Sequence, residues 1–334
     1  MISAPEDYGL TPEQTLSHIS LAEMPEGFDS FWREFRDEIG SLSPHWQGSL
    51  REPVCEIVIP SARYVRVVAR VSIPAGEIRG IIITSHGYAA ETAFSDDPEP
   101  WTDFGLVTVR LRVRGYPPST LDMKDVRADW ILQGIESADA WILNGAVADI
   151  IQACRCGKMA FGPDLPVFLH GESFGGGLAV IAAAQLSEME ESPQRLILGL
   201  PTFGDWIWRS THYCNGSGGQ VTMLLDARRG KQRENLMSNL LLFDASLHAR
   251  NVTCPLLSKL AHVDDTVPAP SAAAIHNAIA SKRKWRFETK YGHFDGGISD
   301  LRRHILFEQI HPQFADPTRE PEETMEVHEG ALKL

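Results

Sequence analysis

The stretch VFLHGESFGGGLAVIAAAQL, residues 167–186, carries the strongest structural signal in this chain. It begins with the apolar run Val167–Leu169, which is typical of a strand buried on both faces of a parallel sheet. It ends with Leu178–Leu186, a run that favours a helix. Between them the chain must turn sharply, and glycines on both sides of a central serine tolerate the close backbone approach that such a turn requires. The stretch therefore predicts a strand, a tight turn and a helix, with Ser173 exposed at the turn.

The turn itself reads Gly171-Glu172-Ser173-Phe174-Gly175 and matches the pattern G-x-S-x-G. In this pattern the serine oxygen is exposed at the end of a strand, and the following helix N-terminus favours developing negative charge. The alternative is a glycine-rich turn with an ordinary serine. A dinucleotide or phosphate loop fits poorly, because neither G-x-G-x-x-G nor a Walker lysine is present. We interpret Ser173 as a nucleophile.

Further strand-like runs alternate with helical patterns along the chain, which predicts an α/β fold. The expected strands span residues 54–60, 64–73, 81–84, 106–111, 166–169, 196–200, 255–260 and 285–289. The expected helices span residues 28–39, 125–153, 174–187, 271–281 and 298–309. We predict a mostly parallel central sheet with helices on both faces and the two N-terminal strands as an antiparallel edge. With Ser173 at its turn, this is the α/β-hydrolase fold.

The chain divides into three expected parts. Residues 1–50 form an N-terminal helical extension that packs on the core. Residues 51–314 form the α/β-hydrolase domain, interrupted at about 205–250 by a helical insertion over the strand ends. Residues 315–334 are rich in glutamate and nearly without large apolar residues, so we expect a flexible acidic tail.

The base and its acid follow from chain order, which in this fold is serine, then aspartate or glutamate, then histidine. His293 comes just after the last expected strand, in Tyr291-Gly292-His293-Phe294. Asp264 follows the preceding strand and begins the segment D-x-x-V-P, with Asp265 as the competing carboxylate. We predict a triad of Ser173, Asp264 and His293, in which the carboxylate fixes the tautomer of the imidazole.

Acyl transfer also needs hydrogen-bond donors at the developing oxyanion. The N–H of Phe174, directly after the nucleophile, is one candidate, and the N–H of Tyr88 in Ser85-His86-Gly87-Tyr88 is the other. A catalytic role for His86 is the weaker alternative, because it precedes Ser173 in the chain. Further candidates for the substrate pocket are Glu172, Trp206, Trp208 and Tyr213, although the three aromatic residues could equally pack in the core.

Composition limits the partners. The net charge of −13 disfavours nucleic acid and anionic membrane surfaces. No stretch is long enough to cross a bilayer, and no secretory signal is visible, so we expect a cytoplasmic protein. The odd number of cysteines, five, agrees with a reducing compartment. Cys154 and Cys156 could form a metal pair, but no second pair lies at a zinc spacing, and we expect no metal and no cofactor.

Several segments resemble, in the same order, the acetyl xylan esterase and cephalosporin C deacetylase group, carbohydrate esterase family seven. The resemblance spans roughly residues 20–310. Its motifs are Phe28-Asp29-Ser30-Phe31-Trp32, His86-Gly87-Tyr88, Arg114-Gly115, the Ser173 turn, Asp264 with Pro268, and Tyr291-Gly292-His293. Two positions depart from the family pattern: Tyr116 replaces a glutamine, and Phe294 replaces a glutamate.

The resemblance implies an esterase that removes acetyl groups from small acetylated sugars and similar esters, without a metal, and often as a homo-oligomer. We expect Arg114 to hold the oxyanion loops together rather than to contact substrate. Two other functions remain open at this point: a peptidase or amidase of the same fold, and a non-catalytic binding protein on a hydrolase fold.

Overall fold

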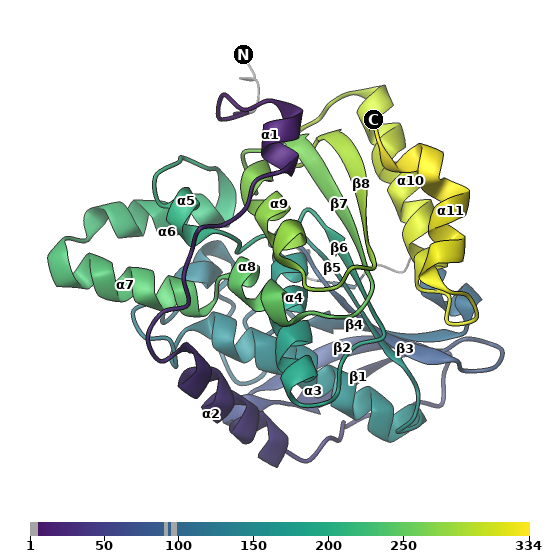
Figure 1. The fold of residues 1–334 in the computed structure, drawn as a ribbon. Coiled ribbons are helices and arrows are strands. Elements are labelled where there is room, and N and C mark those ends of the chain that lie inside the picture. Colours follow the sequence, from purple (N-terminus) through teal and green to yellow (C-terminus); the bar gives the residue numbers. More distant parts are fainter. Residues whose placement is uncertain (1–5, 90–92, 95–98) are drawn as a thin grey trace.

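The computed structural model describes residues 6–89, 93–94 and 99–334. Within this part of the chain, an eight-stranded sheet in the order β1-β2-β4-β3-β5-β6-β7-β8 forms the centre of the molecule (Figure 1). β1 and β2 pair antiparallel, β2 and β4 pair antiparallel, and all other neighbours are parallel. The strands are β1 (Val54–Pro60), β2 (Arg66–Ser72), β3 (Gly80–Ser85), β4 (Leu106–Arg112), β5 (Val167–Glu172), β6 (Arg195–Gly199), β7 (Leu256–Val263) and β8 (Lys284–Tyr291). The predicted fold class is confirmed.

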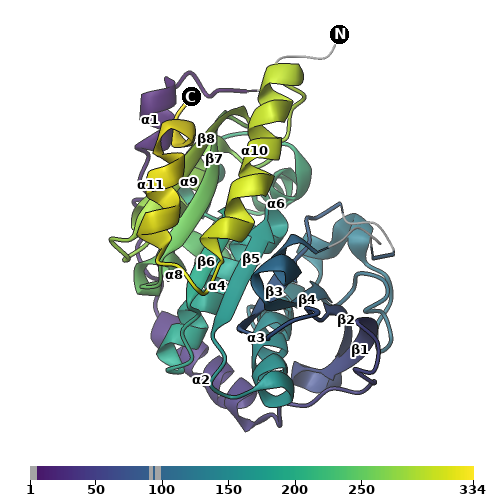
Figure 2. The same ribbon diagram turned by 90° about the vertical axis from the view of Figure 1, so that its right-hand side faces the viewer.

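Helices cover both faces of the sheet (Figure 2). One face carries α2 (Phe28–Ser41), α3 (Ile142–Phe161), α4 (Phe174–Glu188), α8 (Ala245–His248) and α9 (Ala269–Ala278). The other face carries α10 (Ile298–Phe314) and α11 (Pro321–Leu332). Short 3-10 turns occur at residues 62–64, 100–104, 127–132 and 249–251.

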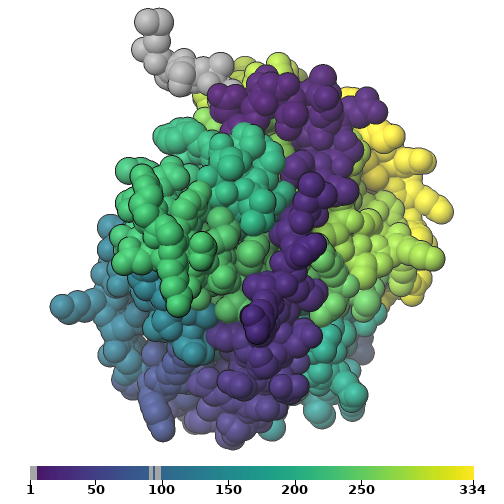
Figure 3. Space-filling view, turned by 60° about the vertical axis from the view of Figure 1, so that its left-hand side comes forward, coloured from purple at the N-terminus to yellow at the C-terminus, as the bar shows by residue number. Residues whose placement is uncertain are grey.

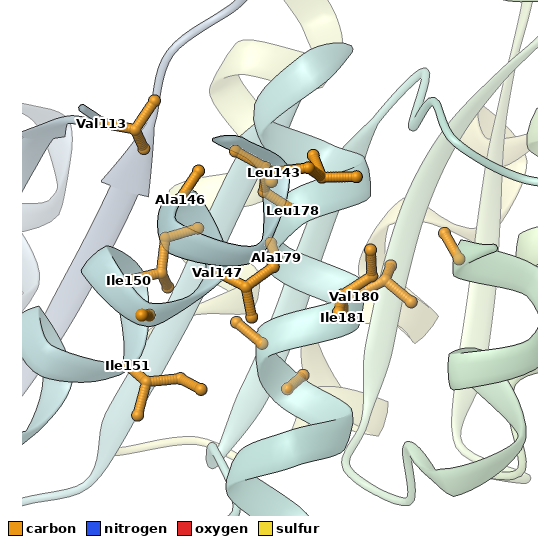
Figure 4. Close-up of a cluster of buried hydrophobic side chains, with 14 of the residues drawn as sticks. Val113, Leu143, Ala146, Val147, Ile150, Ile151, Leu178, Ala179, Val180 and Ile181 are labelled. Atoms are coloured by element: carbon orange, nitrogen blue, oxygen red, sulfur yellow. The ribbon is translucent and has the colours of Figure 1, made fainter. Parts of the chain in front are cut away.

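The strands are apolar throughout because each one contributes to two cores. Ile81 and Ile83 of β3 point into the core beneath α3 and α4, whereas Ile82 points into the core beneath α10 and α11. In the first core, Val147 of α3 lies near Ala179 of α4 (Figure 4). Fully burying one such large aliphatic side chain stabilises the fold by about 1.5–3 kcal/mol.

Two segments differ from the expectation. The helix expected over residues 125–153 begins only at Ile142, because Gly134 takes a left-handed conformation, with φ +74°, and the chain turns there. Residues 315–334, expected as a flexible tail, contain helix α11. Its Met325 is only 2% exposed in the core beneath α10, and Arg283 pairs with Glu320 at 2.6 Å.

Residues 205–250 form helices between β6 and β7. These are α5 (Trp206–Arg209), α6 (Gly216–Ala227) and α7 (Gly230–Leu242), followed by α8; α6 and α7 project to one side of the sheet (Figure 1).

The N-terminal arm, residues 6–27, includes α1 (Pro12–Leu16) and runs over the surface beside these helices (Figure 3). Asn277 Nδ2 donates to the carbonyl of His18 at 2.7 Å, and the His18 ring contacts Asp205 Oδ2 at 2.8 Å. Among the residues that the structure describes, no helix has both the length and the hydrophobicity needed to cross a bilayer.

Candidate active site

Ser173 occupies the sharp turn between β5 and α4. Its φ of 54° and ψ of −112° are unusual for a residue with a side chain, and such strain is held in place by the surrounding structure. Ser173 N donates to the carbonyl of Gly199 at 2.6 Å. A Cβ atom at Gly171 would collide with the carbonyl oxygen of Gly175, and one at Gly175 would lie 2.5 Å from that of Ser85. The turn can therefore form only with glycine on both sides of the serine.

The three residues predicted as a triad lie in hydrogen-bond contact. His293 Nδ1 donates to Asp264 Oδ2 at 2.7 Å, and His293 Nε2 lies 3.0 Å from Ser173 Oγ. Because an ionised carboxylate only accepts, it places the imidazole proton on Nδ1 and leaves Nε2 free to accept from the serine hydroxyl. This arrangement can activate an alcohol as a nucleophile.

The two neighbouring carboxylates have different partners. Asp264 is 2% exposed, and its Oδ1 accepts the N–H groups of Thr266 and Val267 at 3.0 and 3.2 Å. These bonds fix its other oxygen toward His293. Asp265 instead accepts from Asn215 Nδ2 at 2.9 Å, on the insertion. Between the two candidates, the geometry thus brings only Asp264 to the histidine.

The environment of His293 raises its pKa above the ordinary value of 6.5. Burial alone would lower the pKa, but the hydrogen bond and the negative charge of Asp264 oppose burial, and the charge of Glu172 adds to them. The shift favours the imidazolium that forms when the serine gives up its proton. It also means that the resting base is neutral only at a pH above this raised value.

The two predicted oxyanion donors belong to segments that pack together. Phe174 N–H is at the first position of α4, where backbone N–H groups have no partner within the helix. The rings of Tyr88 and Phe174 meet edge to face with centroids 5.6 Å apart. Tyr116 Oη donates to the carbonyl of Tyr88 at 3.0 Å, and Tyr88 Oη accepts from Ile131 N at 3.1 Å. These bonds fix the loop that carries the Tyr88 N–H.

His86 and Arg114 have partners that indicate structural roles. His86 Nε2 accepts from the N–H of Val113 at 3.3 Å, and burial lowers its pKa to about 3. A histidine that stays neutral and bonded to backbone in this way is not available as the base. Arg114 is buried, pairs with Asp149 of α3 at 2.6 Å and donates to the carbonyl of Ala62 at 3.3 Å.

A cavity of about 530 Å³ opens in front of Ser173 and His293. Its apolar side chains include Phe174, Leu200 and Val267. Sequence reasoning missed most of this lining, which includes Ala89, Leu200, Thr202, Gly216, Ser217, Thr266, Val267 and His304. Thr266 and Val267 lie in the D-x-x-V-P segment, and their closeness to Asp264 in this motif could have indicated that they border the cavity. Glu172, a predicted pocket residue, does line the cavity.

The three aromatic candidates of the insertion are not among the residues that line this cavity. Trp206 is 2% exposed and packs over the guanidinium of Arg209 at 4.5 Å. Trp208 stacks on His212 with ring centroids 3.9 Å apart, and Tyr213 is 69% exposed. The expectation of an aromatic acyl wall is therefore corrected: none of the three rings borders the cavity, and Gly216 and Ser217 are the insertion residues that reach it.

Within the described residues, no group of three or more histidine, cysteine or acidic side chains is arranged to hold a metal ion. Cys154 and Cys156 are buried residues of α3, and all five cysteines are free thiols. Burial raises the pKa of Cys156 to about 12, so this thiol stays protonated at neutral pH.

A mostly parallel sheet with a strained serine after β5, an aspartate after β7 and a histidine after β8 defines the chain as an α/β-hydrolase. Residues 10–309 match the family described as Acetyl xylan esterase (AXE1). The chain belongs to the acetyl xylan esterase family and is an ester hydrolase. The resemblance noted in the sequence is confirmed.

Solved structures support the fold. An acetyl xylan esterase from a Paenibacillus species matches with a TM-score of 0.74 and 19% identity, over 89% of this chain and 98% of that chain. Acetyl xylan esterase 1 from a Thermoanaerobacterium species matches with a TM-score of 0.69 and 21% identity, over the same shares. An acylaminoacyl peptidase from Pyrococcus horikoshii matches with a TM-score of 0.55 and 13% identity, over 84% of this chain and 44% of that chain. No curated protein matches the chain.

Proposed function

We propose that the chain is a serine carboxylesterase that removes acetyl and other short acyl groups from small molecules or sugars through Ser173, His293 and Asp264. The observation that carries this proposal is the continuous hydrogen-bond chain from Asp264 through His293 to Ser173, with contacts of 2.7 and 3.0 Å, at the wall of an open cavity. Membership in the acetyl xylan esterase family supports the choice of an acetyl ester.

In the first half of the reaction, Ser173 Oγ attacks the ester carbonyl while His293 Nε2 takes the serine proton. The carbonyl oxygen becomes an oxyanion, which accepts hydrogen bonds from the N–H groups of Tyr88 and Phe174. The imidazolium is stabilised by Asp264. Collapse of the tetrahedral intermediate expels the alcohol, which leaves with the proton from Nε2, and the acyl group stays on the serine.

In the second half, a water molecule attacks the acyl-enzyme, and His293 Nε2 accepts its proton. The same donors stabilise the second oxyanion. The carboxylic acid then leaves, and the proton returns from the imidazolium to Ser173 Oγ. These steps consume one ester and one water and return the enzyme to its resting state.

The test is Ser173→Ala, which should lower kcat for p-nitrophenyl acetate by about four to six orders of magnitude. Unfolding curves should match those of the wild type, and a fluorophosphonate should label the wild type but not the variant. A variant with near-native turnover would refute the assignment. A series of p-nitrophenyl esters from acetate to octanoate, followed by acetylated oligosaccharides, then defines the acyl group; a preference for long chains would contradict an acetyl esterase.

A matched amide substrate distinguishes an esterase from a peptidase or amidase, because the triad is common to both. Failure of the wild type to react with the fluorophosphonate would indicate a non-catalytic binding protein instead. We further propose a cytoplasmic homo-oligomer that acts without a metal, a cofactor or nucleic acid. The five free thiols support a reducing compartment. Light scattering and activity in the presence of a chelator test the assembly state and the metal.

A further inference from the structure

The residue before the nucleophile, Glu172, reaches across a neighbouring strand to a buried lysine. Glu172 on β5 is in register with Gly199 on β6, which is in register with Lys259 on β7. Lys259 Nζ donates to Glu172 Oε1. The bridge passes directly over Gly199, where an added Cβ atom would lie 2.9 Å from that carboxylate oxygen. The sequence thus provides a long charged side chain on each of the flanking strands β5 and β7, and a residue without a side chain on β6 between them.

Lys259 is an unusual residue for its position. Its side chain is only 3% exposed, and it lies over the ring of Phe307 at 4.9 Å from the centroid. A buried ammonium is costly unless it is paired with negative charge. Its second carboxylate, Glu308 on α10, is 3.7 Å away. Burial alone would raise the pKa of Glu172, but the lysine outweighs burial and lowers this pKa. Glu172 is therefore ionised beside the nucleophile at neutral pH.

Glu172 stands between two cavities. It lines the catalytic cavity, and it also lines a second cavity of about 440 Å³ on the α10 side of the sheet. Its negative charge is close enough to His293 to raise the pKa of the imidazole, whereas the charge of Lys259 lowers it. The two charges of the pair thus act on the base in opposite directions.

Ionisable groups from several segments line the two cavities that Glu172 borders. They include His86 after β3, Glu99, Arg110 and Arg112 of β4, His170 on β5, His293 after β8, and His304, Glu308 and His311 on α10. Burial lowers the pKa of His170 to about 4 and also lowers that of His311, so both imidazoles are neutral at pH 7. Arg110 is paired with Glu99 at 2.7 Å. Lys259 Nζ contacts the Glu172 carboxylate directly.

We propose that Lys259 is a positioning residue of this active site: it turns the Glu172 carboxylate across Gly199 and compensates its charge beside the nucleophile. The inference rests on the proposed function. Without the lysine, a free carboxylate one residue from Ser173 would repel the oxyanion that forms there, and it would make His293 more difficult to deprotonate. Without the glutamate, the remaining cation would make His293 easier to deprotonate.

The experiment is a double-mutant cycle with two readouts. The first is kcat/KM for p-nitrophenyl acetate as a function of pH. The second is the pKa of His293 from an NMR titration, in which the His293 signal is the one that disappears in His293→Gln. Glu172→Gln should lower the pKa of His293 by about half a unit to one unit. Lys259→Met should raise this pKa by a similar amount and lower kcat about tenfold. The double variant should return toward the wild type in both readouts.

The matched control is Glu308→Gln, which removes the other carboxylate near the lysine but does not border the catalytic cavity. It should shift the pKa of His293 by less than a third of the Glu172→Gln shift. Single variants that shift this pKa in the same direction, or not at all, would overturn the proposal. So would a double variant as impaired as Lys259→Met, since the lysine would then act only through the fold.

Two results require a separate interpretation: a Lys259→Met variant that does not fold, and a wild type that hydrolyses no ester. If Lys259→Met does not fold, Glu172→Gln decides alone, because its side chain is 42% exposed and the substitution preserves its shape. An unchanged or raised pKa of His293 in that variant overturns the proposal. If the wild type hydrolyses no ester, the proposed function fails, and the NMR titration still decides whether the pair acts on His293, because it requires no turnover.

Discussion

Replacing Asp264 by asparagine removes one charge while preserving the shape of the side chain. Oδ1 of this residue accepts two backbone N–H groups, from Thr266 at 3.0 Å and Val267 at 3.2 Å. The amide oxygen of asparagine must take over these bonds, so its NH₂ group faces His293 Nδ1. Nδ1 then has to accept, and the single proton of the neutral imidazole moves to Nε2, which faces Ser173 Oγ at 3.0 Å. The nitrogen that should receive the serine proton already carries one.

We therefore expect Asp264→Asn to lower kcat about 10⁴-fold, or about 5.4 kcal/mol of transition-state stabilisation. The assay is steady-state hydrolysis of p-nitrophenyl acetate at pH 8, with unfolding curves to show that the variant is folded. The control is Asp265→Asn, whose carboxylate accepts from Asn215 of the insertion and whose kcat should stay within about threefold of the wild type. A loss below tenfold for Asp264→Asn, or a larger loss for Asp265→Asn, would refute the reasoning.

Two further predictions concern pH and stability. Because the pKa of His293 is raised above 6.5 and the base must be neutral, kcat/KM should fall with decreasing pH along a limb whose midpoint lies above 6.5; a midpoint at or below 6.5 would contradict the shift. Met325→Ala should lower the free energy of unfolding in urea by about 2–5 kcal/mol, because its side chain is 2% exposed, whereas Val327→Ala, at 77% exposure, should change it by less than about 0.5 kcal/mol. Equal effects of the two substitutions would mean that α11 does not pack as described.

The fold and the meeting of Ser173, Asp264 and His293 could be predicted from the sequence because their determinants are local. The turn around Ser173 requires glycines at fixed spacing, and the strands are short apolar runs that can be recognised one at a time. Asp264 and His293 follow such runs, and parallel strands all present their carboxyl ends at one edge of the sheet. The order of these local patterns along the chain was therefore sufficient to predict that residues distant in the sequence meet at one edge of the sheet.

The cavity walls could not be predicted in this way, because they depend on how separate loops meet. Trp206 and Gly216 belong to the same insertion, yet only Gly216 reaches the cavity. Lys259 looks like an interruption in an apolar strand until the order β5-β6-β7 places it opposite Glu172, 87 residues away. Helix α11 was missed because a single buried methionine gives little periodic signal within an acidic segment.

The N-terminal arm has a consequence for how the molecule assembles as it leaves the ribosome. Its partners are supplied by residues that are synthesised much later: Asp205 binds His18, Arg250 binds the carbonyl of Ala22, and Asn277 binds the carbonyl of Leu16, 261 residues away. The arm is synthesised before these partners, so it has nothing to dock against until most of the sheet exists. Closing such long loops is slow, so we expect the arm to dock only late in folding.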